Sequence, residues 1–446
     1  MNLSEIMVIV LIVLPSSSFV FLRRGMATAS AVIASVEVGV ASWIYFFPPP
    51  VGIFYVTPLT WIFILMVSSV YLLATIYSIR YMEGLKVWIS PSHYYLMLNL
   101  FTSAMLFSLV INDYGLMWVG IESTTVLSAL LIVLEKNENT LEATWRYIIL
   151  VSAGVAFAFI SIILIYYTTG SLSVSVDTGA GATGRYVSLA VGIALLGFGT
   201  KVGVFPVHTW LPDAHSEAPP AVSAMFSGVL LPVALYVLYR IYEIQPMPYL
   251  YGSVAVLSIV FSAIFLGNQK RYKRMFAYST MENMNLALLG FAIHTDISIA
   301  GAILLLLAHS YGKAGAFFSS GSILKHTGSH KIGRVNGVFR DLPMTGTSLL
   351  LSSLAVTGAP PSGVFFAEIL IFMALVTRGY YIFFVITIIS VFLSFVSINY
   401  NVGRMLFSDS SGIRERRSPL TYISLISSIM PSLVGILFLV GYYAMF

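Results

Sequence analysis

The chain has 446 residues, of which 58% are hydrophobic and only 9% are charged. This composition excludes an ordinary soluble domain of this size and predicts an all-α polytopic membrane protein, whose backbone hydrogen bonds are satisfied within helices. The net charge is +5, but the basic residues form no clustered domain, so we expect no nucleic acid partner. The chain has no cysteine, which excludes cysteine-held clusters and thiolate metal sites. We therefore expect no metal and no cofactor on this chain.

Apolar stretches long enough to cross about 30 Å of hydrocarbon follow one another from end to end. No basic residue precedes the first stretch, so we expect a retained span and not a cleaved signal peptide. The pattern predicts about 14 transmembrane helices, over residues 4–22, 27–47, 54–78, 93–111, 115–134, 142–168, 186–207, 220–243, 249–267, 273–293, 297–324, 345–376, 379–404 and 419–443.

Lysine and arginine fall unequally on the two faces of this topology. With the N-terminus outside, one face receives most of the 23 basic residues, and the opposite face receives only Arg185, Arg240 and Arg378. Cytoplasmic loops are enriched in such residues, so we expect a plasma membrane protein with both termini on the non-cytoplasmic side. The run 414–417 is the simplest example of a cytoplasmic anchor.

Two of the predicted spans contain helix breakers. One has Gly203 to Pro206 inside the seventh span, and the other has Gly358 to Gly363 inside the twelfth. Proline removes a backbone donor and glycine loosens a helix, so both spans are expected to be discontinuous. Breaks at corresponding places favour two inverted repeats, which gives four regions: N-terminal helices 1–92, a first repeat 93–243, a second repeat 249–404 and a last helix 405–446.

One nucleotide-binding pattern is a false match. Gly179, Gly181 and Gly184 have the spacing of a dinucleotide fingerprint. That fingerprint requires a strand before it and a helix directly after it in a soluble βαβ unit, whereas this copy falls in a short loop between two spans.

Ionisable side chains inside the spans are candidates for function, because each costs about 2.5–3.5 kcal/mol near the middle of a bilayer. Both signs occur, which permits pairing inside a bundle. The set comprises Glu37, Glu122, Arg146, Lys201, His208, Glu282, His309, Lys313 and Glu368.

Glu122 and Lys201 form the most informative pair in this set. A carboxylate that faces an ammonium holds both groups charged, and separating them favours their neutral forms, so the pair can act as a switch. A buried lysine can exchange a proton. The alternative is a static ion pair that only fixes helix packing.

The remaining candidates suggest a polar line. His208 lies seven residues after Lys201, two turns on in an ideal helix, and either relays protons or is simply hydrogen-bonded at the break. His309 and Lys313 share a helix face, which favours a polar line through the second half, and the alternative is a lysine that snorkels to the interface or pairs structurally. Glu368 follows the second break, where it ends a path or is a solvated helix-end carboxylate.

Other polar residues carry weaker predictions. Glu37 lies outside both repeats and suits packing at least as well as transport. Arg146 and Glu142 are expected at the membrane interface. His215 and Glu217 are expected in the loop after the first break.

Four segments carry a resemblance to a known family. Residues 199–219 (GTKVGVFPVHTWLPDAHSEAP) strongly resemble the signature of the antiporter-like membrane subunits found in complex I, in group 4 hydrogenases and in multisubunit cation/proton antiporters. Residues 273–282 (KRMFAYSTME), 309–318 (HSYGKAGAFF) and 361–368 (PSGVFFAE) resemble further characteristic segments of the family.

The resemblance implies roles for individual residues. Glu122 matches the family's fifth-helix glutamate, Lys201 the seventh-helix lysine that pairs with it, and Glu368 the terminal group of the twelfth helix. It also implies a hydrated polar axis and a two-fold inverted repeat. Pro232 departs from the pattern, because complex I members usually carry a lysine or histidine there and hydrogenase-type members do not, which favours the hydrogenase branch. Asn283 and Asn285 replace a histidine and a glycine common in that branch.

The sequence therefore predicts a proton-translocating subunit, with no catalytic residue of its own, in a membrane-bound respiratory redox complex. Expected partners are the lipid bilayer, other membrane subunits and a peripheral redox arm, and any quinone would bind in a neighbouring subunit. The alternatives are a cation/proton antiporter subunit without a redox partner and an inactive scaffold. The residues expected to carry protons are Glu122, Lys201, His208, Glu282, His309, Lys313 and Glu368.

Overall fold

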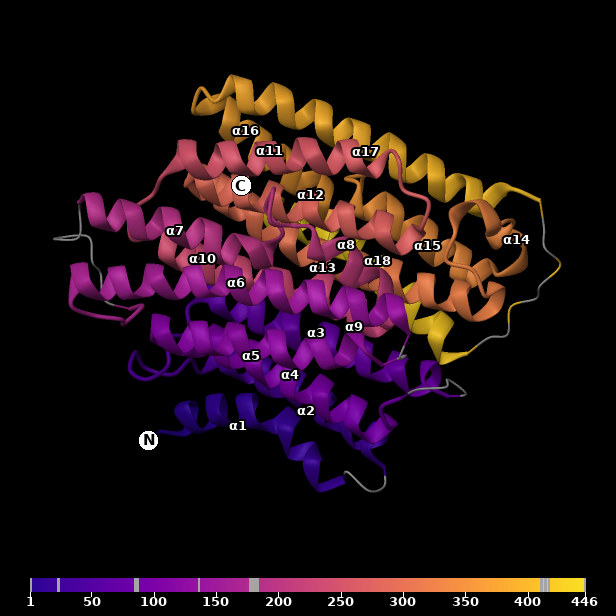
Figure 1. The fold of residues 1–446 in the computed structure, drawn as a ribbon, viewed down its shortest axis with the longest axis horizontal. Coiled ribbons are helices and arrows are strands. Elements are labelled where there is room, and N and C mark those ends of the chain that lie inside the picture. The colour runs from indigo at the N-terminus through magenta and orange to yellow at the C-terminus, as the bar shows by residue number, and fades with distance from the viewer. Residues whose placement is uncertain are drawn as a thin grey trace. The chain divides into compact units, whose positions relative to one another are not determined.

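The computed structural model describes residues 2–21, 25–83, 88–134, 137–175, 184–409, 412, 415 and 418–444. Gly179 and Gly181 of the false nucleotide match, and the predicted anchor residues Arg414, Arg416 and Arg417, lie outside the described residues. The elements fall into two compact units, which are described separately (Figure 1).

Unit 1 comprises Met1–Gly203, Glu217–Val222 and Val229–Met247. Its helices follow the predicted spans closely. They are α1 (Leu3–Ser17), η1 (Ser18–Phe21), α2 (Met26–Phe46), α3 (Pro58–Tyr81), α4 (Pro91–Val110), α5 (Tyr114–Ile132), α6 (Glu138–Thr169), α7 (Arg185–Val202) and α10 (Leu231–Tyr242).

Unit 2 comprises Val204–Ser216, Ser223–Gly228 and Pro248–Phe446. The short helix α9 (Pro220–Met225) and the π-helical segment η3 (Phe226–Leu230) are each divided between the units. The helices of unit 2 are α8 (Trp210–Glu217, of which Glu217 belongs to unit 1), α11 (Pro248–Leu266), α12 (Tyr272–Ile293), α13 (Asp296–Thr327), η4 (Ile332–Arg334), α14 (Val338–Asp341), α15 (Pro343–Val356), α16 (Gly363–Thr377), α17 (Tyr381–Phe407) and α18 (Pro419–Ala444).

The all-α prediction is confirmed, since the described residues form helices joined by loops, with two isolated β-bridges. Among the described residues, twelve helices are long and apolar enough to cross a membrane, and α15 and α16 are shorter apolar helices. The count of 14 spans stays a prediction. The division into two inverted repeats, 93–243 and 249–404, also stays a prediction.

Local sequence explains where the two longest helices begin. Asn137 caps α6 and Thr295 caps α13, each through a side chain that accepts a hydrogen bond from the third residue of the helix. Such caps satisfy backbone donors that a helix leaves free at its start. Both helices have 32 residues, a length of about 48 Å, so each exceeds the hydrocarbon thickness.

Both discontinuous spans are confirmed. Gly203 ends α7 with a φ of 89°, and Gly358 follows α15 with a φ of 74°, a backbone conformation that residues with a side chain rarely adopt. Helix α16 restarts at Gly363, capped by Ser362. Each predicted span is therefore two half-helices joined by irregular backbone.

The expectation of a loop around His215 and Glu217 is wrong, because both residues lie in helix α8 and His215 is fully buried. Pro212, which lies between the first break and His215 in the sequence, does not interrupt this helix. It falls in the first turn of α8, where a missing N–H costs no helical hydrogen bond.

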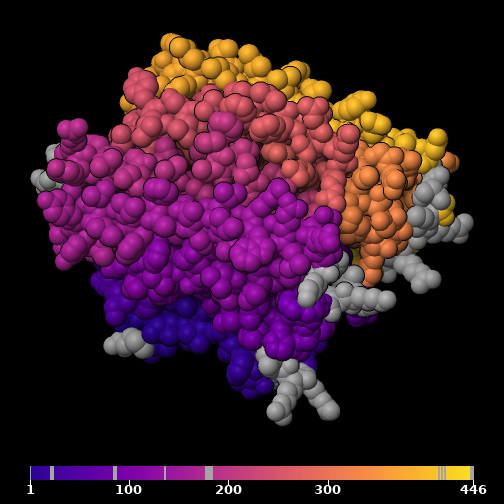
Figure 2. Space-filling model, in the orientation of Figure 1, coloured from indigo at the N-terminus to yellow at the C-terminus, as the bar shows by residue number. Residues whose placement is uncertain are grey.

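Exposed apolar side chains cover the outer helices of each unit, as expected for surfaces that face lipid. In unit 1, α6 exposes Trp145, Ile149 and Tyr167. In unit 2, α17 exposes Ile382 and Phe392, and its orange atoms form the upper edge of Figure 2.

Arg240, which the predicted topology assigns to the non-cytoplasmic face, is buried and connects two helices within unit 1. Its guanidinium donates to Thr57 Oγ1 at 2.7 Å and to Tyr236 Oη at 3.2 Å, and it pairs with Glu243 at 3.0 Å. These bonds join the start of α3 to the last turn of α10.

We predict that Arg240→Met lowers stability by about 2 kcal/mol, because it removes the hydrogen bonds that the buried guanidinium makes to Thr57, Tyr236 and Glu243. Thermal unfolding of the purified protein in detergent measures this as a lower melting temperature. The exposed Arg378→Met is the matched control and should unfold with the wild type. Equal melting temperatures for all three proteins would contradict a stabilising role for Arg240.

Candidate functional site

Lys201 lies in the last turn of α7 and is fully buried. Its ammonium donates to the Ile121 carbonyl at 2.7 Å and to the hydroxyls of Thr124 and Thr125, each at 2.6 Å. All three acceptors belong to α5. Because an ammonium has three N–H donors and no acceptor, this set satisfies its charged form completely.

Glu122, the residue after Ile121 in α5, is held by two hydrogen bonds. One carboxylate oxygen accepts from Ser152 of α6 at 2.8 Å, and the other accepts a longer bond of 3.5 Å from Thr125. In the part of the chain that the structure describes, Lys201 and Glu122 form no ion pair. The direct contact expected from the sequence is replaced by a hydroxyl, because the lysine reaches the oxygens of Ile121 and Thr124 while Ser152 holds the glutamate.

Thr125 therefore connects the two charged groups. Its hydroxyl accepts from Lys201 and donates toward Glu122. Hydrogen bonds in such a chain polarise one another and are stronger in a medium of low dielectric constant. A proton leaving the lysine thus has a path to the carboxylate through one hydroxyl.

Close packing of α6 against α7 fixes the position of this lysine (Figure 1). A Cβ atom added at Gly154 of α6 would lie 2.5 Å from the Thr200 side chain, and one added at Gly197 of α7 would lie 2.6 Å from the Ala158 Cα. Small residues allow two membrane helices to approach in this way. Larger side chains at either glycine would displace the turn that carries Lys201.

His208 belongs to unit 2, in the segment between α7 and α8. Because Gly203 ends α7, the two-turn helical spacing from Lys201 does not apply. The imidazole is buried between Phe205 and Phe265, with ring centres 5.7 and 5.8 Å away, and its Nδ1 has no hydrogen-bond partner among the described residues. Its local surroundings are therefore mainly aromatic.

Lys313 lies in the middle of α13 and is fully buried, one turn after His309. Its ammonium donates to the Phe276 carbonyl of α12 at 2.8 Å and lies 5.7 Å from the centre of the Phe276 ring. Neither ring nitrogen of His309 is hydrogen-bonded within the described parts of the chain. Lys313 thus has fewer oxygen partners than Lys201, and His309 keeps both nitrogens available.

The segment before Pro232 provides a polar backbone group beside His309. Proline has no N–H for the carbonyl of Gly228, four residues earlier. The Ser310 hydroxyl of α13 donates to that carbonyl instead, and Gly228 permits the approach, since a Cβ there would lie 3.0 Å from the Ser310 carbonyl oxygen. The backbone ahead of Pro232 therefore presents an oxygen that is bonded to Ser310, the neighbour of His309.

Glu282 of α12 and Glu368 of α16 line one small cavity. Its volume of about 10 Å³ is close to the minimum for one water molecule. Polar walls come from Asn283, Thr357 and Ser394. Glu368 also packs on the break, because a Cβ at Gly358 would lie 2.6 Å from its Oε1.

Two other predicted residues lie apart from these groups. Arg146 pairs with Glu142 one turn away, and both side chains are exposed, as expected for an interfacial pair. Glu37 of α2 is fully buried, and its carboxylate has no hydrogen-bond partner among the described residues. The choice between packing and transport for Glu37 stays open.

Several polar partners were not identified from the sequence. Thr124 and Thr125 bind Lys201, Ser152 binds Glu122, and the Phe276 carbonyl binds Lys313. The two threonines had a visible signal, since they follow Glu122 by two and three residues within a predicted span. The serine and the carbonyl had none, because their relevance depends on which helices are neighbours.

Several known proteins are similar to this chain. The family model described as "NADH:quinone oxidoreductase/Mrp antiporter, TM" matches residues 111–394. The hydrogenase-4 component F homolog of Methylacidiphilum infernorum is 32% identical over 354 residues, which cover 74% of each chain. NADH-quinone oxidoreductase subunit N of Desulforudis audaxviator is 29% identical, over 83% of this chain and 78% of its own.

Solved structures show the same fold. A chain of the archaeal membrane-bound sulfane sulfur reductase superposes with a TM-score of 0.88 at 23% identity, covering 96% of this chain and 94% of its own. A chain of the Mrp complex from Dietzia sp. DQ12-45-1b gives a TM-score of 0.88 at 19% identity, with coverages of 98% and 95%.

We predict that Thr125→Val lowers proton translocation by the assembled complex about tenfold, a loss of about 1.4 kcal/mol, because it removes the hydroxyl that accepts from Lys201 and donates to Glu122. Acidification of membrane vesicles, followed with a pH-sensitive dye, measures the rate. Thr125→Ser keeps the hydroxyl and should keep most of the rate. A valine variant as active as the serine variant would show that the hydroxyl is dispensable.

Proposed function

We propose, because this chain belongs to the NADH:quinone oxidoreductase/Mrp antiporter transmembrane family, that it is the proton-translocating, antiporter-like subunit of a membrane-bound respiratory redox complex. The relatives named as hydrogenase-4 component F and NADH-quinone oxidoreductase subunit N support a redox partner. The observation that carries the proposal is the fully buried Lys201, whose ammonium is held by three oxygens and connected through Thr125 to Glu122.

The first step takes place in unit 1. An N–H bond of Lys201 breaks as an O–H bond forms on Thr125, while Thr125 gives its own hydrogen to the Glu122 carboxylate. The products are a neutral amine and a carboxylic acid, and the reverse transfer restores the charged pair. Because Lys201 is fully buried and its charge is held by hydrogen bonds, a change in hydration or in a nearby charge would shift this balance.

The later steps use the polar groups of unit 2. His309 and Lys313 lie one turn apart on α13, so a proton can be exchanged between neighbouring side chains on one helix face. Glu282 and Glu368 share a cavity sized for about one water, and that water would link the two carboxyl groups. We propose proton uptake from the cytoplasm toward Lys201, passage through Lys313 and His309, and release past Glu368, with His208 and Glu282 as further relay groups.

The cellular setting follows from the same proposal. The chain would lie in the plasma membrane with both termini on the non-cytoplasmic side, as the distribution of basic residues favours. Its repeats would be 93–243 and 249–404. Other membrane subunits and a peripheral redox arm would be its partners, with any quinone bound in a neighbouring subunit.

A cation/proton antiporter subunit without a redox partner is the second candidate. The printed family description includes Mrp antiporters, and the Mrp complex of Dietzia has the same fold. Vesicles that contain the complex distinguish the two functions. A sodium or potassium pulse without an electron donor should move no protons under the redox proposal and should move them under the antiporter alternative.

We predict that Lys201→Ala abolishes proton pumping while redox turnover of the complex persists or falls, because it removes the buried ammonium that gives its proton through Thr125 to Glu122. Proton uptake into vesicles, energised with NADH or hydrogen, is measured together with electron transfer. Lys325→Ala, the same change at an exposed lysine, should pump normally.

Subunit content of the purified complex separates loss of pumping from loss of assembly. An assembled Lys201→Ala complex that pumps at the wild-type rate would refute the role of Lys201 and favour an inactive channel in this subunit.

A further inference from the structure

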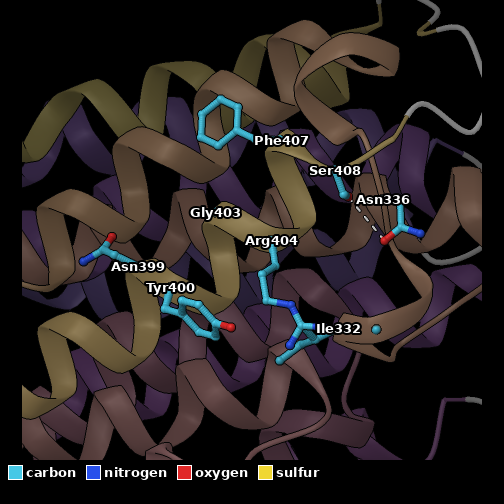
Figure 3. Close-up of a pocket in the computed structure, with 9 residues that line it drawn as sticks. Ile332, Asn336, Asn399, Tyr400, Gly403, Arg404, Phe407 and Ser408 are labelled. Atoms are coloured by element: carbon cyan, nitrogen blue, oxygen red, sulfur yellow. Dashed lines mark hydrogen bonds between the residues drawn. The ribbon is translucent and has the colours of Figure 1, made fainter.

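Unit 2 contains a second, larger pocket that the proton path does not use. Its volume is about 510 Å³, within the range of small-molecule sites. One wall is the segment around η4, with Ile332 and Asn336, and the other is the last two turns of α17 (Figure 3). The pocket is therefore formed where a long apolar helix ends.

Arg404 supplies an uncompensated positive charge to this pocket. Its guanidinium lies 5.8 Å from the centre of the Tyr400 ring, and in Figure 3 it extends past Tyr400 toward Ile332. Among the described residues, Arg404 has no hydrogen bond and no ion pair. A guanidinium has five N–H donors in a planar fork that matches a phosphate or carboxylate.

Asn336 adds a neutral donor. Its side-chain oxygen accepts from Ser408 at 3.3 Å, which leaves its amide nitrogen without a partner in the described residues. Asp409 follows Ser408 in the chain and does not line the pocket. The lining therefore combines one cation, Arg404, with amide and hydroxyl groups and contains no carboxylate, which favours an anionic ligand.

A continuous apolar stripe leads into the pocket along α17. Its residues recur every three or four positions and so lie on one helix face. Each is exposed by 47% or more of its surface, and they are Ile382, Val385, Ile389, Phe392, Val396 and Tyr400. Arg404 and Phe407 continue the same spacing, so the positive charge of Arg404 lies near one end of the apolar stripe.

We propose that this pocket binds the phosphate headgroup of an anionic phospholipid, whose acyl chains lie along the exposed stripe of α17. The 27 residues of α17 span about 40 Å, so a helix that crosses about 30 Å of hydrocarbon places its last turns at headgroup level. Arg404 binds the phosphate, Asn336 donates to it, and Phe407 and the stripe contact the chains. Basic pockets beside membrane helices recognise acidic headgroups by this combination of charge and apolar contact.

The test uses the purified complex in detergent, supplied with defined lipids, and native mass spectrometry to measure binding. Wild type should bind phosphatidylglycerol in preference to phosphatidylcholine, and Arg404→Gln should weaken binding of phosphatidylglycerol about fivefold. Arg378→Gln removes an exposed arginine near the other end of α17 and should bind as the wild type does. The readout needs neither redox activity nor pumping, so it is independent of the proposed function.

Three results would overturn the proposal. Equal phosphatidylglycerol binding by wild type and Arg404→Gln would remove the arginine from the site. Competition by inorganic phosphate alone, with no preference for the lipid, would show an anion site without acyl recognition. Absence of bound lipid from the assembled complex would show that a neighbouring subunit covers the pocket and that the stripe is a protein interface.

Discussion

The structure depends most on one interaction, the ammonium of Lys201 held by three oxygens of α5 in the interior of unit 1. A charge at this depth costs about 2.5–3.5 kcal/mol on insertion scales. Hydrogen bonds to a charged group contribute about 1.5–3 kcal/mol each, so three of them offset that cost. Other features of the unit serve this geometry, including the glycine contact between α6 and α7 and the end of α7 at Gly203.

The oxygens around Lys201 give the site its switching property. A direct ion pair would stabilise both charges strongly and resist proton transfer. Here a neutral hydroxyl separates ammonium and carboxylate, so each charge is satisfied locally, and in the proposed mechanism a proton would pass without large movement of either side chain. Unit 2 contains a different arrangement. Among its described residues, Lys313 has one backbone acceptor, the His309 nitrogens have no hydrogen-bond partner, and two glutamates share a cavity for about one water.

Sequence predicted the architecture well, because the signals were long and local. The apolar stretches predicted the helices, and Gly203, Pro206 and Gly358 predicted both breaks. The predicted loop around Pro212 and His215 was wrong, because a proline in a first helical turn does not differ in sequence from one in a loop. The sequence also identified the candidate charged residues, because ionisable residues inside apolar spans are easily recognised.

The contacts of those charges could not be predicted from sequence. Ser152, Ser310 and the Phe276 carbonyl matter only through the packing of helices that are distant in the chain. The replacement of a central lysine by Pro232 is a similar case. Its consequence, a Gly228 carbonyl that accepts from Ser310, depends on α13 lying beside that backbone.

A double-mutant cycle tests the central claim most directly. Proton pumping is measured for Glu122→Gln, for the variant that lacks the Thr125 hydroxyl, and for the two changes combined. If the hydroxyl connects Lys201 to Glu122, the combined variant pumps no worse than the poorer single variant, because both changes interrupt one path. Rates that multiply, so that the combined loss equals the product of the two single losses, would show independent groups and contradict the account.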